Sequence, residues 1–467
     1  MKEPPTTLAE ALVVIAHLAR RLDALAAENA RLQEENARLR TENTRLRALF
    51  EPDPNTPSGM TPPYQKANLS RGRRKKPGRP KGHQGAHRPP PEQIDNHEEH
   101  TLAHCPDCGA KLGQARSSRT RYTEDLPPAR PTVTEHTIQR YWCPCCRKTV
   151  EPKVAAALPG STLGLNLVLS TAWLHYRLGV STGAIVCWLA TICRLRVSKG
   201  GLTQAWRGLA DVFQLAYEQL RQQAQQSAVL HADETGWRVS GRTHWLWCFT
   251  NKELAYYAIE RCRGSPVVNQ VLGEVFAGVL VCDFYAAYNV VCAWAKQRCV
   301  AHLLRELQKV SLRNQSVEWR AFYKRLKRLL RDGLRLRARK DQLGDADYAR
   351  RCGCLAQRLV DLLESEYSDA DCRRLRKRLA RHRAEMFTFL WQPDVTADNN
   401  LAERALRFAV QGRKNYYGNR SARGAEAQAI LMSILRTVEL RGHEPVSYLR
   451  DSLQELLLTP KALPRAA

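Results

Sequence analysis

The sequence predicts a multidomain protein with an α/β core, a helical insertion in that core, and smaller modules ahead of it. Three observations predict this architecture. Heptads open the chain, two C-x-x-C pairs follow, and from residue 228 strand-like and helix-like segments alternate. The chain has 467 residues, of which 43% are hydrophobic, so it can fold several cores. Single domains typically take about 100–200 residues.

Composition narrows the class of partner. The formal net charge is +27 and the sequence pI is about 9.8, which predicts a polyanionic partner, most simply nucleic acid. The sequence has no apolar run long enough to span a bilayer, so we expect no membrane partner. The start MKEPPTTLAEAL lacks the features of a signal peptide, which favours a cytoplasmic location. There thiols stay reduced, so the 15 cysteines are expected to be metal ligands or buried apolar residues.

Residues 8–46 repeat every seven and predict a coiled coil. One seam position carries Leu8, Ile15, Leu22, Asn29, Asn36 and Asn43, and the other carries Ala11, Leu18, Leu25, Leu32, Leu39 and Leu46. Asparagine at the first of these positions favours a parallel two-stranded pair. We therefore expect a homodimer or higher oligomer. The alternative is a long solvated helix that packs on its own body.

Residues 51–92 are rich in proline and glycine and predict a flexible basic linker. Its core KKPGRPKG resembles an AT-hook, in which an Arg-Pro segment lies in a narrow minor groove. The candidate DNA contacts are Arg73, Arg74, Lys75, Lys76, Arg79 and Lys81. A basic linker that only raises non-specific affinity is the alternative.

The two cysteine pairs predict a structural zinc site. CPDC spans Cys105 to Cys108 and CPCC spans Cys143 to Cys146. Four thiolates complete a closed tetrahedral Zn²⁺ site with no open position. Cys145 competes within the second pair, and His100 or His104 could replace one thiol.

Residues 163–208 predict helices with a Gly-Val-Ser turn, in which Ser181 can cap the second helix. A DNA-binding helix-turn-helix and an ordinary helical hairpin fit equally well.

From residue 228 the pattern predicts strand, strand, strand, helix, strand. The first strand is VLHAD continuing into TGWRV, and it ends at an expected turn at Ser240-Gly241. The other strands are residues 243–250, 254–260 and 278–282, with a helix over 265–275. The last strand is short and apolar, as in a buried parallel strand.

Three acids stand out around this core: Asp233 in HADETGWRV, Asp283 in VCDFYAAYN and Glu403 in ADNNLAERALR. Carboxylates can hold two divalent metals about 3.5–4 Å apart, an arrangement that suits attack on a phosphodiester. Oxygen ligands favour Mg²⁺, with Mn²⁺ as a substitute. Of the neighbouring acids, Glu234 should point to the opposite face, Asp398 should cap the helix that carries Glu403, and Glu426 is a weaker rival for the third ligand.

The placement of the acids resembles the ribonuclease-H-like fold, with one acid on the first strand, one after the fourth and one on a later helix. The motifs HADETGWRV, CDFYAAYN, CVAHLLREL, DNNLAERALR and GRKNYYGNRSARGAEAQAILMSILRT are similar to those of DDE transposases of the insertion-sequence-66 type. The resemblance covers essentially the whole chain.

This resemblance implies that Asp233, Asp283 and Glu403 form the DDE triad with two Mg²⁺ per site. It implies a bacterial, nucleoid-associated enzyme that cuts the ends of its element and joins them to target DNA, sometimes with accessory proteins of that element. His302, in a C-x-x-H spacing with Cys299, is expected near the acids. It is a candidate DNA contact together with Arg404, Arg407, Arg413 and Lys414, while Tyr416 and Tyr417 are candidates for base stacking.

The expected domains follow this order: coiled coil 1–50, linker 51–95, zinc-binding domain 96–155, helical region 156–226, first part of the core 227–308, helical insertion 309–392, second part of the core 393–440 and C-terminal segment 441–467. Two rival functions remain. One is a catalytically silent zinc-containing DNA-binding regulator, and the other is a metal-dependent nuclease that cuts without joining.

Overall fold

The computed structural model describes residues 8–48, 91–126 and 129–458, and its contacts divide the chain into two units, residues 1–124 and 125–467. In the first unit, α1 (Leu8–Ala48) is a single helix of 41 residues. Its leucines Leu25, Leu32 and Leu39 are 61%, 45% and 55% exposed. The predicted helix is confirmed, whereas its pairing with a second copy stays a prediction. The AT-hook-like segment and its six candidate cations lie outside the described residues.

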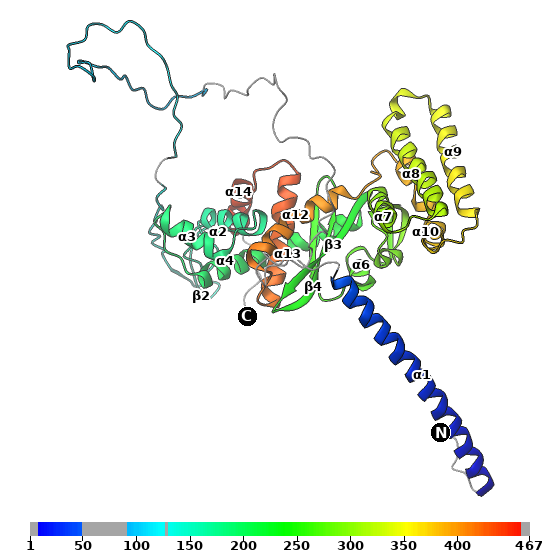
Figure 1. The fold of residues 1–467 in the computed structure, drawn as a ribbon. Coiled ribbons are helices and arrows are strands. Elements are labelled where there is room, and N and C mark those ends of the chain that lie inside the picture. The colour runs from blue at the N-terminus through cyan, green and yellow to red at the C-terminus, as the bar shows by residue number, and fades with distance from the viewer. Residues whose placement is uncertain (1–7, 49–90, 127–128, 459–467) are drawn as a thin grey trace. The chain divides into compact units, whose positions relative to one another are not determined.

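The second unit contains a five-stranded mixed sheet with β3 at its centre (Figure 1). The strand order is β5-β4-β3-β6-β7, with β3, β4 and β5 antiparallel to one another in turn and β6 and β7 parallel to their neighbours. The bounds are β3 Val229–Val239, β4 Arg242–Thr250, β5 Ala255–Glu260, α6 Ser265–Leu272, β6 Val275–Cys282 and β7 Cys292–Arg298. The predicted order of the first five elements is confirmed. The strand β7 was not predicted.

The turn of the β3–β4 hairpin lies where the sequence predicts it. Ser240 and Gly241 have φ of 50° and 74°, and the flanking residues Val239 and Arg242 pair directly. Two central residues with positive φ match the right-handed twist of the strands, which fixes the register of the hairpin. This register sets which face of β3 each side chain occupies.

Helices from the end of the chain cover the sheet. These are α12 (Asn400–Tyr416), which contacts β3 and β4, and α13 (Ala422–Leu440), which contacts β5. Because β5 is an edge strand, its free N–H groups need partners. The hydroxyls of Ser433 and Thr437 accept the N–H groups of Tyr257 and Ala255 at 2.9 and 3.1 Å. The helix α13 thus closes this edge, and α14 (Pro445–Leu458) follows it.

Residues 165–225 are helical, as expected, and pack into the same hydrophobic core as the sheet. The elements are α2 Leu165–Ala172, the π-helical turn η1 Trp173–Arg177, α3 Thr182–Thr191, α4 Lys199–Val212 and α5 Gln214–Gln225. Ser181 caps α3 as predicted, since its hydroxyl accepts the N–H of Ala184. The described helices include none that is long and apolar enough to cross a membrane.

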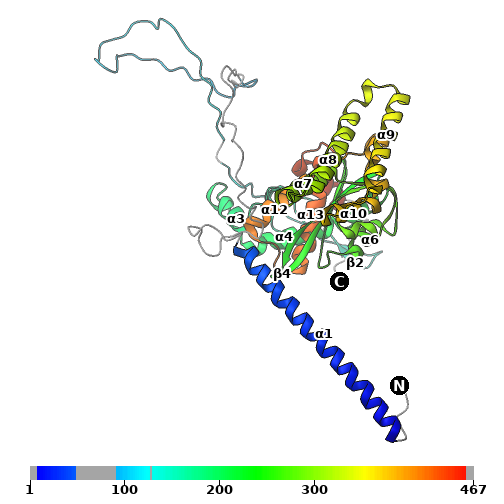
Figure 2. The same cartoon turned by 45° about the vertical axis from the view of Figure 1, so that its right-hand side comes forward.

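A second hydrophobic core lies in the helices between β7 and α12. The elements are α7 Val300–Arg313, α8 Val317–Ala338, α9 Asp345–Glu364, α10 Ala370–Arg381 and α11 Thr388–Trp391, with short 3₁₀ turns between them. Trp319, Phe322, Leu355 and Leu375 are buried in this core. In both views α8 and α9 lie side by side and extend away from the sheet (Figures 1 and 2).

Candidate active site

The two aspartates lie on adjacent parallel strands. Asp233 is within β3, and Asp283 directly follows β6. The β3–β6 register pairs Val229 with Val279 and His231 with Val281, so continuing it brings Asp233 level with Asp283. Asp233 accepts the N–H of Glu234 at 3.0 Å, and Asp283 accepts the N–H of Tyr285 at 2.8 Å. The two aspartates thus lie at the same level of two adjacent strands.

Glu403 lies in the first turn of α12, and Asn399 fixes where that helix begins. Asn399 is fully buried, and its Nδ2 donates to the carbonyl of Ala232 at 2.7 Å. Its Oδ1 lies 3.1 Å from His231 Nδ1, and its N–H donates to Cys299 Sγ at 3.2 Å. The start of α12 is therefore bonded to the strand residues beside Asp233. These hydrogen bonds of Asn399 were not predicted from the sequence.

The N-cap of α12 is Asn399, one residue after the predicted Asp398, whose carboxylate accepts the N–H of Asn400 at 3.1 Å.

The carboxylates are close enough to affect one another. Burial raises the pKa of Asp233 from 3.8 to about 8, and the charges of Glu234, Asp283 and, least, Glu403 add to this rise. Desolvation and like charges both disfavour an ionised carboxylate. A strongly raised pKa in a group of acids is typical of a functional site.

The carboxylate of Glu403 pairs with Arg305 and lies near His302. Arg305 Nη2 is 2.7 Å and His302 Nδ1 is 3.5 Å from Glu403 Oε1. Within the described part of the chain, the one group of three potential metal ligands lying within 4.8 Å of one another is Cys299, His302 and Glu403. The two aspartates are not in that group. The three acids therefore form no group of ligand atoms within 4.8 Å of one another. Asp233 and Asp283 lie level on adjacent strands, and Glu403, paired with Arg305, is near enough for its charge to raise the pKa of Asp233.

His302 lies on α7 near the acids, as the sequence predicts. Its Nδ1 is buried and has no hydrogen-bond partner among the described atoms. Burial lowers the pKa of His302, and the charge of Arg305 lowers it further, while Glu403 and Asp283 oppose the shift. A largely neutral imidazole can accept or donate a hydrogen bond near the acids.

Glu234 belongs to a different set of contacts from Asp233, as expected for adjacent residues on a strand. Its carboxylate pairs with Arg263 at 2.9 Å and accepts the hydroxyl of Tyr288 at 2.6 Å. The Arg263 guanidinium in turn lies 4.3 Å from the ring centres of Trp245 and Tyr285. These contacts give Glu234 a structural role.

A buried arginine on the unpredicted strand β7 supports the loop that carries Asp283. Arg298 is fully buried and donates through Nη1 to the carbonyl of Asp283 at 2.7 Å and through Nη2 to Asn289 Oδ1 at 2.7 Å. Its Nε pairs with Glu385 at 2.5 Å. Arg298 thereby connects the second acid to the helical insertion.

The predicted DNA contacts on α12 differ in accessibility. Arg404, Arg407 and Lys414 are exposed. The Arg413 guanidinium instead donates to the carbonyl of Gly236 on β3.

The prediction that Tyr416 is available for base stacking is wrong. Its ring packs 4.6 Å from that of His175, because the end of α12 lies against the helical region. Tyr417 is 78% exposed.

Each cysteine pair lies in a tight turn. In the first unit, Gly109 N–H donates to the carbonyl of Cys105 at 2.9 Å, and backbone N–H groups of Cys108 and Asp107 lower the pKa of the Cys105 thiol. In the second unit, the short strands β1 (Tyr141–Cys143) and β2 (Lys148–Val150) flank the other pair. There the N–H of Cys146 lies 3.4 Å from Cys143 Sγ and lowers its pKa. N–H groups directed at sulfur favour the thiolate that zinc requires.

Comparison with known proteins matches two parts of the chain to one family of transposases. Residues 103–147 match the zinc-finger binding domain of transposase IS66, and residues 161–427 match the Transposase IS66 family. Three relatives come from Sinorhizobium fredii (strain NBRC 101917 / NGR234). The uncharacterized protein y4qI is 26% identical over 294 residues, covering 56% of this chain and 54% of the relative. The uncharacterized protein y4jD is 24% identical over 221 residues, covering 43% and 42%.

The third relative, the uncharacterized protein y4hP, is 37% identical over 68 residues, covering 15% of this chain and 12% of the relative. The matched regions therefore span about half or less of each relative's length. The family match covers more than half of the chain and includes all three acids, so the protein belongs to the Transposase IS66 family.

Proposed function

We propose that the protein is a DDE transposase with a ribonuclease-H-like core. It would bind the ends of a bacterial insertion sequence, cut them by metal-dependent phosphodiester hydrolysis, and join the 3′-hydroxyl ends to target DNA by transesterification. The observation that supports this most is the level placement of Asp233 and Asp283 on adjacent parallel strands. Glu403, in the first turn of α12, is near enough for its charge to raise the pKa of Asp233.

The three acids have the type of ligand atom that divalent metal ions require. Asp233, Asp283 and Glu403 offer only oxygen atoms, which Mg²⁺ and Mn²⁺ prefer, and two ions per site are proposed. When bound, these ions would activate the attacking water or 3′-hydroxyl and stabilise the leaving oxygen. Burial and, after it, the charges of neighbouring carboxylates raise the pKa of Asp233, and a cation would relieve the repulsion between these carboxylates. A bound metal would compete with Arg305 for the carboxylate of Glu403.

We expect Mn²⁺ to raise the melting temperature more at pH 8 than at pH 6. The pKa of Asp233 is about 8 when folded and ordinarily 3.8, so the folded chain keeps a proton that the unfolded chain releases. Its ionisation therefore costs stability as pH rises from about 4 to 8. Metal binding requires the ionised carboxylate, so the metal must displace a proton at pH 6 but far less at pH 8.

Thermal unfolding with and without Mn²⁺ measures this effect, with Asp233→Asn as the control. The variant should show a smaller increment that no longer depends on pH. Equal Mn²⁺ increments at both pH values in the wild type would contradict the metal site.

For the zinc-finger domain we propose Cys105, Cys108, Cys143 and Cys146 as ligands of one structural Zn²⁺. The double variant Cys105→Ser, Cys108→Ser should lose the zinc, because two ligands cannot hold a closed site. Cys145→Ser is the matched control and should retain it. Elemental analysis of the purified proteins measures the content, and unchanged zinc in the double variant would refute this ligand set.

We further propose that α1 pairs with a second copy. A helix with leucines exposed along one seam buries them by forming a coiled coil. The partners proposed are double-stranded DNA at element ends and at the target, with accessory proteins of the same element as further candidates.

A strand-joining assay tests the proposed function. Full-length protein is incubated with labelled DNA carrying the flanks of the gene's own element and with a target plasmid in Mg²⁺. A transposase transfers label to the plasmid. A nuclease yields cut ends without joined product, and a DNA-binding regulator yields neither.

A further inference from the structure

The outward face of α8 is rich in cations. Five exposed residues recur at intervals of three or four: Arg320, Lys324, Arg328, Arg331 and Arg335. Residues spaced this way share one side of a helix. We call this set the α8 stripe. Most of the apolar side chains of α8 are buried on the opposite side. Eight cations and two acids give this helix of 22 residues a net charge of +6.

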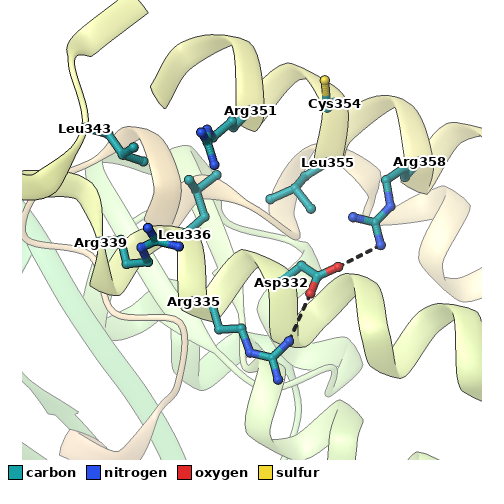
Figure 3. Close-up of a pocket in the computed structure, with 9 residues that line it drawn as sticks. All are labelled: Asp332, Arg335, Leu336, Arg339, Leu343, Arg351, Cys354, Leu355 and Arg358. Atoms are coloured by element: carbon teal, nitrogen blue, oxygen red, sulfur yellow. Dashed lines mark hydrogen bonds and ion pairs between the residues drawn. The ribbon is translucent and has the colours of Figure 1, made fainter. Parts of the chain in front are cut away.

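A hollow of about 280 Å³ between α8 and α9 adjoins the stripe (Figure 3). Four arginines line it: Arg335, Arg339, Arg351 and Arg358. Its single lining acid, Asp332, pairs with Arg335 at 3.2 Å and with Arg358 at 2.9 Å. Arg339 is exposed and makes no ion pair with any described residue.

Two cations of the stripe, Arg328 and Arg335, pair with Asp332 of the same helix at 3.9 and 3.2 Å. Three other acids of the insertion make contacts away from the stripe. Glu318 accepts the N–H groups of Ser368 and Asp369, and Asp369 caps α10. Asp347 pairs with Arg350 and Arg351. Lys324 and Arg331 have no ion-pair partner among the described residues. Lys324 and Arg331 of the stripe, like Arg339 of the hollow, thus remain available to an external polyanion.

The insertion has a fixed position relative to the candidate active site. The Arg378 guanidinium of α10 lies 4.5 Å from the ring centre of Phe284, which follows Asp283. At the other end, Arg337 of α8 donates to the carbonyl of Pro393, in the segment that leads to α12. A ligand held by α8 would therefore keep a defined place with respect to the acids.

We propose that the α8 stripe and the arginines of the hollow bind the phosphate backbone of double-stranded DNA. The proposal rests on the proposed function and adds a second contact region outside the catalytic core. The stripe spans about 15 residues, or about 22 Å at the rise of an α-helix. That length matches about six base pairs of duplex at about 3.4 Å each. Phosphate contacts position a duplex without reading its sequence.

The test measures binding of the full-length protein to a duplex of about 30 base pairs across about 50–200 mM salt. In the triple variant Lys324→Gln, Arg331→Gln, Arg339→Gln we expect the Kd to rise about 10-fold or more. The slope of log K against log salt should fall by about 2.7, because each phosphate that is no longer neutralised accounts for about 0.9. Asp332→Asn removes the one acid of the hollow and should tighten binding several-fold.

The control triple Arg207→Gln, Arg242→Gln, Arg261→Gln removes the same charge from exposed positions on other elements. It should keep a slope near that of the wild type. Equal reductions in affinity in both triple variants would mean that only net charge matters, which would overturn the proposal. An unchanged affinity of the Lys324, Arg331 and Arg339 triple variant would also overturn it, as would an Asp332→Asn variant that binds DNA no more tightly than the wild type. DNA cleavage by the wild-type protein is measured separately and tests the proposed function. If the wild type cuts no DNA but the variants still show these differences in binding, the proposed DNA-binding surface holds and only the proposed function fails.

Discussion

Asp233→Asn is expected to reduce Mg²⁺-dependent DNA cleavage by about 10³-fold or more, beyond the roughly 10–100-fold typical of outer-shell changes. Asp233 lies on the central strand, level with Asp283, and its carboxylate would be a direct metal ligand. An amide keeps the shape of the side chain but lacks the charge. DNA binding should persist, since the candidate DNA contacts are cations on other elements.

The same substitution should not lower stability. Burial and neighbouring charges raise the pKa of Asp233 to about 8, so the carboxylate is held against an electrostatic cost that asparagine removes. Glu426→Gln is the matched control, because Glu426 is exposed on α13 and pairs with Arg423. Cleavage that survives in Asp233→Asn would remove Asp233 from the site. A lowered melting temperature in Asp233→Asn would contradict the electrostatic account.

Arg298→Met should lower the free energy of unfolding by about 3–5 kcal/mol, as expected when one partner of a buried pair is removed. Methionine can fill the space but leaves Glu385, the carbonyl of Asp283 and Asn289 without their donor. Burial alone would raise the pKa of Glu385, and the charges of Arg298 and His382 instead keep it below its usual range. Cleavage should fall as well, because the Asp283 loop loses its support.

Chemical denaturation of Arg298→Met, Glu385→Leu and the double variant measures the coupling. The double variant should recover part of the stability, because no carboxylate is left unpaired, yet it should not recover cleavage. A loss below about 1 kcal/mol in Arg298→Met would place this pair with ordinary surface pairs and contradict its structural role.

Local sequence patterns predicted much of the sheet and the position of the acids. The period-two strands and the Ser240-Gly241 turn are short-range signals, and both are present in the structure. The strand CAWAKQR was missed because it is short and partly polar. Arg298 at its end was missed because buried arginine is rare in proteins. Its partner Glu385 is 87 residues away in sequence.

The third acid illustrates the limit of sequence reasoning. A helix start near Asn399 was predictable from capping preferences. Its bonds to His231 and Ala232 were not, because these residues are 168 and 167 positions away. The pairing of Glu403 with Arg305 likewise depends on how α7 packs against α12. Tyr416 was misjudged for the same reason, since its partner His175 belongs to a distant helical segment.

The most direct test of the central claim is strand cleavage on DNA carrying the flanks of the gene's own element. Wild-type and Glu403→Gln proteins are compared in Mg²⁺ and in EDTA, and the chemistry of each new end is determined. The account predicts 3′-hydroxyl ends at the element boundary in the wild-type Mg²⁺ reaction alone. Cleavage by Glu403→Gln at the wild-type rate, or cleavage by the wild type in EDTA, would contradict a metal-dependent site built on these three carboxylates.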